Sequence, residues 1–443
     1  MSATWVRRLP APVRARIEGS PTLQRIVPNA GWMVADRLIR MALGLVVGAW
    51  VARYLGPAQY GAFNFALAFV ALFTPIATLG IERIVVRDLV DHPDAGREIL
   101  GSAFRMRLVG ALVALALSVA AVAWLRPHDR LAVALVAVMA AASVVQSLDV
   151  IDLWFQSAMR SRVAVMATAT AFVLAALLRI ALIVARAPLI AFAWAAFAEA
   201  ALAAAGLAIV YRRAGGALAA WRWSRTRGRS LIADGWPLML SSVMILIYLR
   251  IDQVMLGQMA TAAELGAYSA AVKLVEVWYF VPTALVAAIF PSIVEARRLG
   301  EAVFYDRLQK LYGAMALAGY AVALPTCVLS PWIVRIVFGA DYARAAPMLA
   351  VLVWSILFTN LGVARSSFLT TMNMTRPYLV TVALGAIVNV ALNLLLIPRW
   401  GGMGAVIASC VAYWLAAHGS CYLYRPLVRT GNMLTRALLM PGF

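Results

Sequence analysis

Long apolar stretches separated by short polar gaps run through the chain from Trp32 to Tyr424. Because an α-helix rises 1.5 Å per residue, about twenty apolar residues cross a hydrocarbon layer of about 30 Å. We therefore expect an all-α integral membrane protein, and 64% hydrophobic against 13% charged residues agrees with this. The pattern predicts twelve transmembrane helices, at residues 32–54, 61–81, 104–125, 131–153, 163–185, 188–211, 236–257, 267–290, 312–334, 346–371, 378–397 and 402–424.

Basic residues are concentrated in alternate gaps between these spans, and Lys and Arg number 39 against 19 Asp and Glu. Positive charge marks cytoplasmic loops, so this pattern predicts that both termini are cytoplasmic. Most of the formal charge of +20 is then a topology signal and requires no nucleic acid partner. The arginine-rich gap after the sixth span also suits contact with the headgroups of membrane lipids.

That gap is the longest, and it divides the chain into two sets of six spans. We expect a cytoplasmic tail at 1–31, a six-helix bundle at 32–211, a basic linker at 212–233, a second bundle at 234–424 and a tail at 425–443. A short repeat supports two related halves, because Tyr60-Gly61-Ala62-Phe63-Asn64 opens the second span and Leu265-Gly266-Ala267-Tyr268-Ser269 opens the eighth. A substrate path would then lie between the halves.

Other chemistry has little support in the sequence. The predicted outer loops are too short to hold a catalytic domain, which disfavours a membrane polymerase or ligase. Cys327, Cys410 and Cys421 have no CxxC spacing, and the three histidines are scattered, so no disulfide framework, metal site or cofactor is predicted.

Charged residues inside the spans are the strongest functional signal, because each costs about 2.5 to 3.5 kcal/mol on insertion scales. Lys273 and Glu276 are three apart and would be able to pair along one helix face. Arg250 and Asp252 are two apart and point to nearly opposite sides, so at least one must face another helix or an aqueous cavity. Asp149, Asp152 and Arg365 fall near predicted cytoplasmic ends, where side chains can reach the interface, and we expect no role in the site from them.

These considerations give two sets of candidate residues. A cationic set suits a polyanionic headgroup, and an acidic set would bind a coupling ion. The substrate-binding candidates are Arg37, Arg40, Arg250 and Lys273, and the ion-coupling candidates are Glu199, Asp252 and Glu276.

Several segments resemble bacterial polysaccharide flippases of the multidrug/oligosaccharidyl-lipid/polysaccharide exporter superfamily. They are residues 51–64 (VARYLGPAQYGAFN), 77–81 (ATLGI), 85–89 (VVRDL), 250–257 (RIDQVMLG), 276–283 (EVWYFVPT), and 389–393 leading into 396–405 (LIPRWGGMGA). As a set they cover essentially the whole length from about residue 30 to 424. None of them is a catalytic signature.

The resemblance implies two six-helix bundles around a cationic central cavity that opens alternately to each side, and no enzymatic activity. It implies a cargo of undecaprenyl-pyrophosphate-linked oligosaccharide, flipped to the periplasmic leaflet for O-antigen or exopolysaccharide synthesis. A polysaccharide polymerase and glycosyltransferases would be its partners. The cationic set would then hold the pyrophosphate, because guanidinium groups bind phosphate oxygens in pairs. Inward-pointing acids would reduce the positive charge of the cavity.

Other functions remain open at this point. A cation-coupled drug exporter of the same superfamily would use Glu199, Asp252 or Glu276 to bind a proton, sodium or a cationic drug. A lipid II flippase would share the architecture, although two further C-terminal spans expected from that resemblance are missing here.

Overall fold

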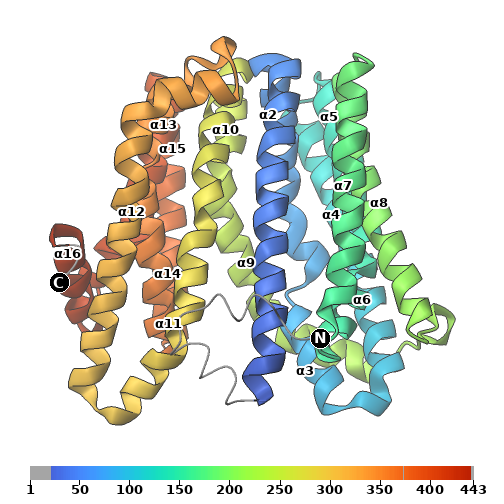
Figure 1. Cartoon of the computed structure of the whole chain (residues 1–443). Coiled ribbons are helices and arrows are strands. Elements are labelled where there is room, and N and C mark those ends of the chain that lie inside the picture. The colour runs from blue at the N-terminus through green and yellow to red at the C-terminus, as the bar shows by residue number, and fades with distance from the viewer. Residues whose placement is uncertain (1–20, 373, 441–443) are drawn as a thin grey trace.

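The computed structural model describes residues 21–372 and 374–440, with side chains described from residue 40 onward except at 287, 288, 291, 370 and 375. Within that range the secondary structure is helical (Figure 1). The N-terminal half contains α2 (Pro21–Thr78), α3 (Glu82–Asp91), α4 (Gly96–Leu125), α5 (Arg130–Val145), α6 (Val150–Ser157), α7 (Ser161–Val184) and α8 (Leu189–Arg213). The C-terminal half contains α9 (Arg225–Met259), α10 (Ala262–Glu276), α11 (Phe280–Leu299), α12 (Glu301–Val337), α13 (Ala345–Leu352), α14 (Ser355–Thr371), α15 (Thr375–Ala417) and α16 (Val428–Leu439).

The number of membrane crossings follows from helix length and from two glycines. Ten helical segments of the described chain are long and apolar enough to span a membrane. One of them, Arg40–Asp91, has 52 residues, about 78 Å of helix and far more than one crossing needs. It turns back at Gly56 (φ 69°), and Arg376–Ala417 turns back at Gly401 (φ 54°), in the left-handed region that glycine tolerates. Each of these two segments crosses twice, so the predicted twelve crossings are confirmed.

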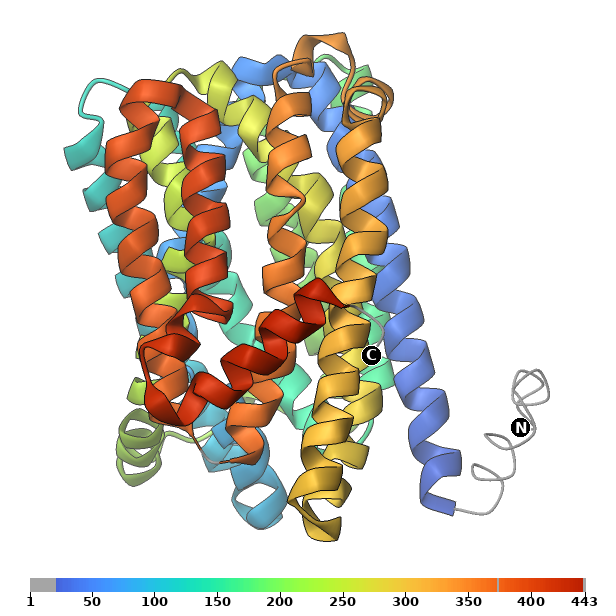
Figure 2. The same ribbon diagram turned by 90° about the vertical axis from the view of Figure 1, so that its left-hand side faces the viewer.

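The helices form two lobes. In the N-terminal lobe α2 packs against α4, α5 and α7, and in the C-terminal lobe α9 packs against α15 and α12 against α14. Helix α2 also contacts α9 and α10, so it lies between the lobes (Figure 1). The first turns of α2 lie at one end of the bundle, and α16 begins nearer that end and runs obliquely toward the middle of the bundle (Figure 2). We call the end with the first turns of α2 the inner end, and the end with the Gly56 turn the outer end.

Two local features differ from the expected boundaries. Helix α9 begins at Arg225, within the range expected to be linker, and contains Pro237. The eighth predicted span is broken by a 3₁₀ turn at Val277–Tyr279, which separates α10 from α11 just before Pro282.

The largest hydrophobic core cluster joins the lobes at the outer end. A single cluster of buried residues at the outer end includes Val51 and Phe65 of α2 together with Tyr268 of α10 and Tyr342 of the C-terminal lobe. Toward the inner end one buried cluster lies mainly in the N-terminal lobe but includes Leu231 of α9, and another lies in the C-terminal lobe. The Tyr342 hydroxyl donates a hydrogen bond of 2.7 Å to the Ala52 carbonyl across the interface. The outer ends of the lobes are therefore closed against each other.

The two repeat segments form the centre of this outer closure. A Cβ atom on Gly61 would overlap the Ala262 carbonyl oxygen, and one on Gly266 would overlap the Pro57 carbonyl oxygen. The backbones of α2 and α10 thus touch directly at equivalent positions of the short repeat. Small residues permit such close approach of membrane helices.

Candidate functional site

A polar pocket lies between the lobes beneath the outer closure. We call this cavity of about 230 Å³ the interface pocket. Helix α2 contributes one wall of it, and α9 and α10 contribute the other. Its lining residues are Asn64, Leu67, Ala68, Ala71, Arg250, Gln253, Ser269, Val272, Lys273 and Glu276.

The charged groups of the interface pocket are unequally paired. Arg250 Nη2 lies 2.9 Å from Glu276 Oε1. Lys273 lines the pocket with an exposed side chain, and no carboxylate in the described chain forms an ion pair with it. Glu276 therefore pairs with Arg250 on α9. It does not pair with Lys273, although the spacing of these two residues would allow a pair. The pocket carries one ammonium group that is free to bind an anion.

Asp252 lies on the other side of α9 and is buried, with 3% of its surface exposed. Its carboxylate accepts hydrogen bonds from the Tyr268 hydroxyl, from Ser409 Oγ at 3.0 Å and from the Gln253 backbone N–H at 2.8 Å. Asp252 and Glu276 both line a small void of about 10 Å³. The opposite orientation of Arg250 and Asp252 expected from their spacing is confirmed.

A larger cavity of about 610 Å³ lies inside the N-terminal lobe, and we call it the N-lobe chamber. It shares Leu67 and Ala71 with the interface pocket, so the two cavities adjoin along one face of α2. Its polar and charged lining residues are Thr74, Glu82, Arg107, Ser143, Gln146, Asp149, Asp152, Gln156, Thr168, Arg179 and Glu199.

Acidic groups outnumber basic ones in this chamber. Glu82, Asp149, Asp152 and Glu199 face two arginines, and one arginine is already committed, because Arg179 Nη2 lies 2.6 Å from Glu199 Oε2. Arg107 is the second, with 5% of its surface exposed. Its Nε has no hydrogen-bond partner within the part of the chain that the structure describes.

The remaining cationic candidates lie elsewhere. Arg40 donates to the Val165 carbonyl at 3.1 Å and to Thr168 Oγ1 at 2.9 Å on α7. Arg40 therefore contacts Thr168, a lining residue of the N-lobe chamber. It does not line the interface pocket with Arg250 and Lys273. Arg37 lies in α2, but its side chain is outside the described part.

Of the charged residues of the chamber, sequence reasoning identified only Glu199 and missed five others, namely Glu82, Arg107, Asp149, Asp152 and Arg179. Asp149 and Asp152 fall near a predicted helix end, where the sequence indicates no role in the site. The fourth span is in fact broken by a 3₁₀ turn at Gln146–Asp149, and both acids line the chamber at this break. The available signal was their spacing, since residues three apart share a helix face.

Arg365 is another residue that differs from expectation. It does not reach the interface but is buried, with 2% of its surface exposed. Its guanidinium donates to Thr381 Oγ1 at 2.8 Å, to Ser420 Oγ at 3.1 Å and to Cys421 Sγ at 3.3 Å. It thus joins α14, α15 and the segment before α16.

Removing this guanidinium is expected to destabilise the inner end of the C-terminal lobe. Arg365→Ala would leave a cavity and unpaired hydroxyls, which we expect to cost about 2 to 4 kcal/mol of unfolding free energy. Thermal unfolding of the purified protein in detergent would measure this loss. Arg298→Ala, at an exposed position of α11, is the control and should leave the melting temperature unchanged. An equal melting temperature for both variants would show that Arg365 has no structural role.

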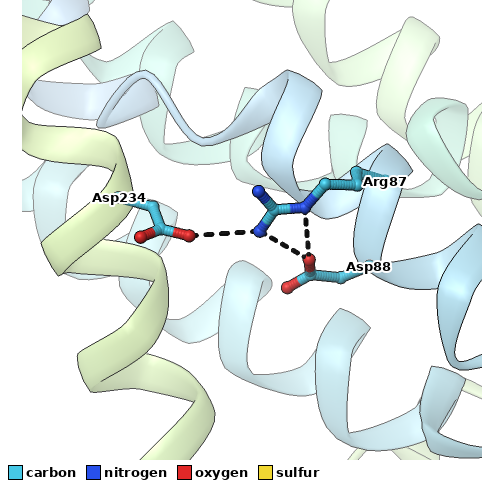
Figure 3. Close-up of polar contacts among 3 residues, drawn as sticks. All are labelled: Arg87, Asp88 and Asp234. Carbon is cyan, nitrogen blue, oxygen red and sulfur yellow. Dashed lines mark hydrogen bonds and ion pairs between the residues drawn. The ribbon is translucent and has the colours of Figure 1, made fainter.

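The inner ends of the lobes meet at an ion pair shown in Figure 3. Arg87 of α3 donates to Asp88 Oδ1 at 2.9 Å and to Asp234 Oδ2 of α9 at 3.1 Å. The Arg87 and Asp234 side chains are 55% and 45% exposed, so water screens their attraction. An exposed ion pair of this kind contributes little stability, so it holds α3 and α9 together only weakly.

Reversing one charge of this inner ion pair should impair transport, and reversing both should restore it. Arg87→Asp would place three carboxylates together and is expected to slow transport by less than about tenfold, because exposed ion pairs contribute little. The Arg87→Asp/Asp234→Arg double variant should recover most of the wild-type transport rate. One transport assay would compare the wild type, the single variant and the double variant. If the double variant is no better than Arg87→Asp, the two residues do not act as a pair across the lobes.

Two helical lobes with polar cavities, built from segments long and apolar enough to span a membrane, define the architecture of a multi-pass membrane protein. The family described as "Polysaccharide biosynthesis protein" matches residues 26–297, more than half of the chain, and MatE matches residues 237–395. The chain belongs to the polysaccharide biosynthesis protein family, and the resemblance seen in its sequence is confirmed. A search of curated proteins gave no match.

Several solved structures share this fold. Lipid II flippase MurJ in an inward closed conformation superposes with a TM-score of 0.72 at 12% identity, over 92% of this chain and 91% of that chain. An inward-facing multidrug resistance MATE family transporter of the MOP superfamily superposes with a TM-score of 0.67 at 15% identity, over 91% of this chain and 96% of that chain. A MOP superfamily transporter from Pyrococcus furiosus Vc1 (DSM3638) superposes with a TM-score of 0.53 at 14% identity, over 91% of this chain and 96% of that chain. That transporter is described by the reverse polarity of its binding pocket. At these identities the likeness is one of fold.

Proposed function

We propose that this protein flips undecaprenyl-pyrophosphate-linked oligosaccharide repeat units from the cytoplasmic to the periplasmic leaflet of the bacterial inner membrane. Both termini are cytoplasmic in this proposal, and transport proceeds by alternating access without chemistry on the cargo. The flipped units serve the synthesis of a surface polysaccharide such as O-antigen or exopolysaccharide. A polysaccharide polymerase and glycosyltransferases act after and before the flippase.

The ammonium of Lys273, which has no ion-pair partner within the part of the chain that the structure describes, is the observation that carries this proposal. An uncompensated cation at membrane depth is costly unless an anion is bound there. The interface pocket places Lys273 beside Arg250, whose guanidinium is shared with Glu276. A diphosphate in this pocket would contact Lys273 directly and Arg250 with part of its donors, while the polyprenyl chain stays in lipid.

Asp252 is the acid best suited to couple transport to an ion. Glu199 and Glu276 each have an arginine partner, whereas Asp252 is held by hydroxyl and backbone donors. A buried carboxylate without a paired cation can exchange a proton with little rearrangement of its neighbours. In this proposal the protonation of Asp252 shifts the balance between the inward and outward states.

A deletion strain tests the flippase proposal. Loss of the gene should leave lipid-linked repeat units in the cytoplasmic leaflet, as measured by their protection from an impermeant sugar-oxidising reagent added to intact spheroplasts. Units that accumulate on the periplasmic side would indicate a block in polymerisation and would contradict a flippase.

One observation favours a second candidate function. The four carboxylates of the N-lobe chamber against two arginines suit a cationic drug. A drug exporter should lower the susceptibility of cells to lipophilic cations such as ethidium when overexpressed, with no change in lipid-linked sugars. A flippase should give the reverse pair of results.

A further inference from the structure

The N-lobe chamber has a charge opposite to that needed for a diphosphate. Its lining side chains carry four carboxylates and two guanidinium groups, a net charge of about −2 when all are ionised. The adjoining interface pocket carries Arg250, Lys273 and Glu276, which leaves it cationic. The two cavities share Leu67 and Ala71. A ligand lying along α2 would therefore have one end in the anionic chamber and the other in the cationic interface pocket.

The chamber also offers the hydrogen-bonding groups that bind hydroxyl-rich ligands. Carboxylates accept from hydroxyls, and Gln146, Gln156 and Ser143 both donate and accept. The Asp152 carboxylate is already oriented by a hydrogen bond of 2.9 Å from Gln156 Nε2. A volume of about 610 Å³ is within the range of about 300 to 1,000 Å³ typical of ligand pockets.

Arg107 is a separate indication that a ligand belongs here. It lines the chamber, it is 95% buried by its exposed fraction of 5%, and its Nε finds no acceptor among the described residues. A buried donor without an acceptor is costly, so this position calls for a ligand oxygen. A sugar hydroxyl or ring oxygen supplies one.

The electrostatic balance determines which sugars fit. A carboxylate on the glycan would enter a chamber where acids already outnumber bases, and like charges in a partly desolvated site repel strongly. Neutral sugars avoid this penalty, and protonated amino sugars gain attraction from Asp149 and Asp152.

We infer that the N-lobe chamber binds the glycan of the lipid-linked cargo and selects neutral or amino sugars over uronates and other acidic sugars. This inference rests on the proposed flippase function. The diphosphate would occupy the interface pocket at the same time, so that headgroup and glycan are recognised by different lobes.

Binding of two matched probes tests the selectivity. We would reconstitute the full chain in nanodiscs and measure its affinity for two fluorescent polyprenyl diphosphate disaccharides, one ending in glucose and the other in glucuronate. The glucose probe should bind about tenfold tighter. The Asp149→Asn/Asp152→Asn variant should bring the two affinities close together, mainly by strengthening binding of the glucuronate probe.

Control variants separate this effect from general damage. Asp306→Asn, an exposed acid of α12 outside the chamber, should keep the wild-type preference. Arg107→Gln should weaken both probes by a similar factor. If the wild type binds the two probes equally, or prefers glucuronate, the selectivity inference is wrong while the flippase proposal stands, and this result does not depend on any variant folding. If neither probe binds but ethidium does, both proposals fail and the drug exporter is favoured.

Discussion

Leucine at position 61 is expected to abolish transport by keeping the outer ends of the two lobes apart. The structure leaves no space for a side chain there, because even a Cβ would overlap the Ala262 carbonyl oxygen of α10. Overpacking against backbone costs at least about 1 to 3 kcal/mol, which disfavours the closed outer end by about ten- to hundredfold. Gly266→Leu should act in the same way, because Gly266 meets the Pro57 carbonyl oxygen from the opposite lobe.

Accessibility of the interface pocket from outside would measure this effect. A cysteine introduced at Ser269, in a chain whose three native cysteines are replaced by serine, should react faster with an impermeant maleimide in the Gly61→Leu variant. Gly48→Leu is the matched control, because a Cβ on Gly48 has no neighbour within 4 Å. Normal export and unchanged labelling in Gly61→Leu would refute an outer gate at this position.

Loss of the Lys273 ammonium is expected to reduce transport by about ten- to hundredfold, the effect of removing one hydrogen-bonded charge from a bound diphosphate. Lys273→Arg should retain most activity, and Lys273→Glu should be inactive. Lys310 is the matched control, since it pairs with Asp306 on the exposed side of α12, and Lys310→Ala should transport normally. Surface polysaccharide per cell, normalised to the amount of protein in the membrane, is the readout.

Glu276→Gln provides the opposite test of the same pocket. This substitution would release Arg250 from its carboxylate partner, so a diphosphate probe should bind more tightly than to the wild type. Weaker binding would show that the ion pair itself is needed to shape the pocket. In that case the number of unpaired cations in the pocket would not determine its affinity for the diphosphate probe.

The topology was predictable because the physical constraint on it is strong. Apolar length and arginine placement determine how often and in which direction a chain crosses a bilayer, and the twelve crossings were predicted from these alone. The glycine turns at Gly56 and Gly401 and the broken eighth span follow from local rules for glycine and proline. The short repeat also places Gly61 and Gly266 at equivalent positions. It does not predict that the backbones of α2 and α10 touch at these glycines.

The site was only partly predictable because sequence spacing gives neighbours on one helix and not across helices. The two-residue spacing of Arg250 and Asp252 correctly separated them. The spacing of Lys273 and Glu276 allows them to pair, but it could not show that Arg250 on α9 pairs with Glu276. Asp149 and Asp152 were missed because depth was estimated from a straight helix, and a 3₁₀ turn places them in the chamber wall.

Reconstituted transport is the most direct test of a cationic pocket that carries a diphosphate. Purified protein would be incorporated into liposomes containing a fluorescent polyprenyl diphosphate disaccharide, and its movement between leaflets would be followed by quenching from outside. We expect the wild type to equilibrate the probe and the Lys273→Ala/Arg250→Gln variant to leave it where it was inserted. Equal rates for the wild type and this variant, or no movement above empty liposomes, would contradict the account.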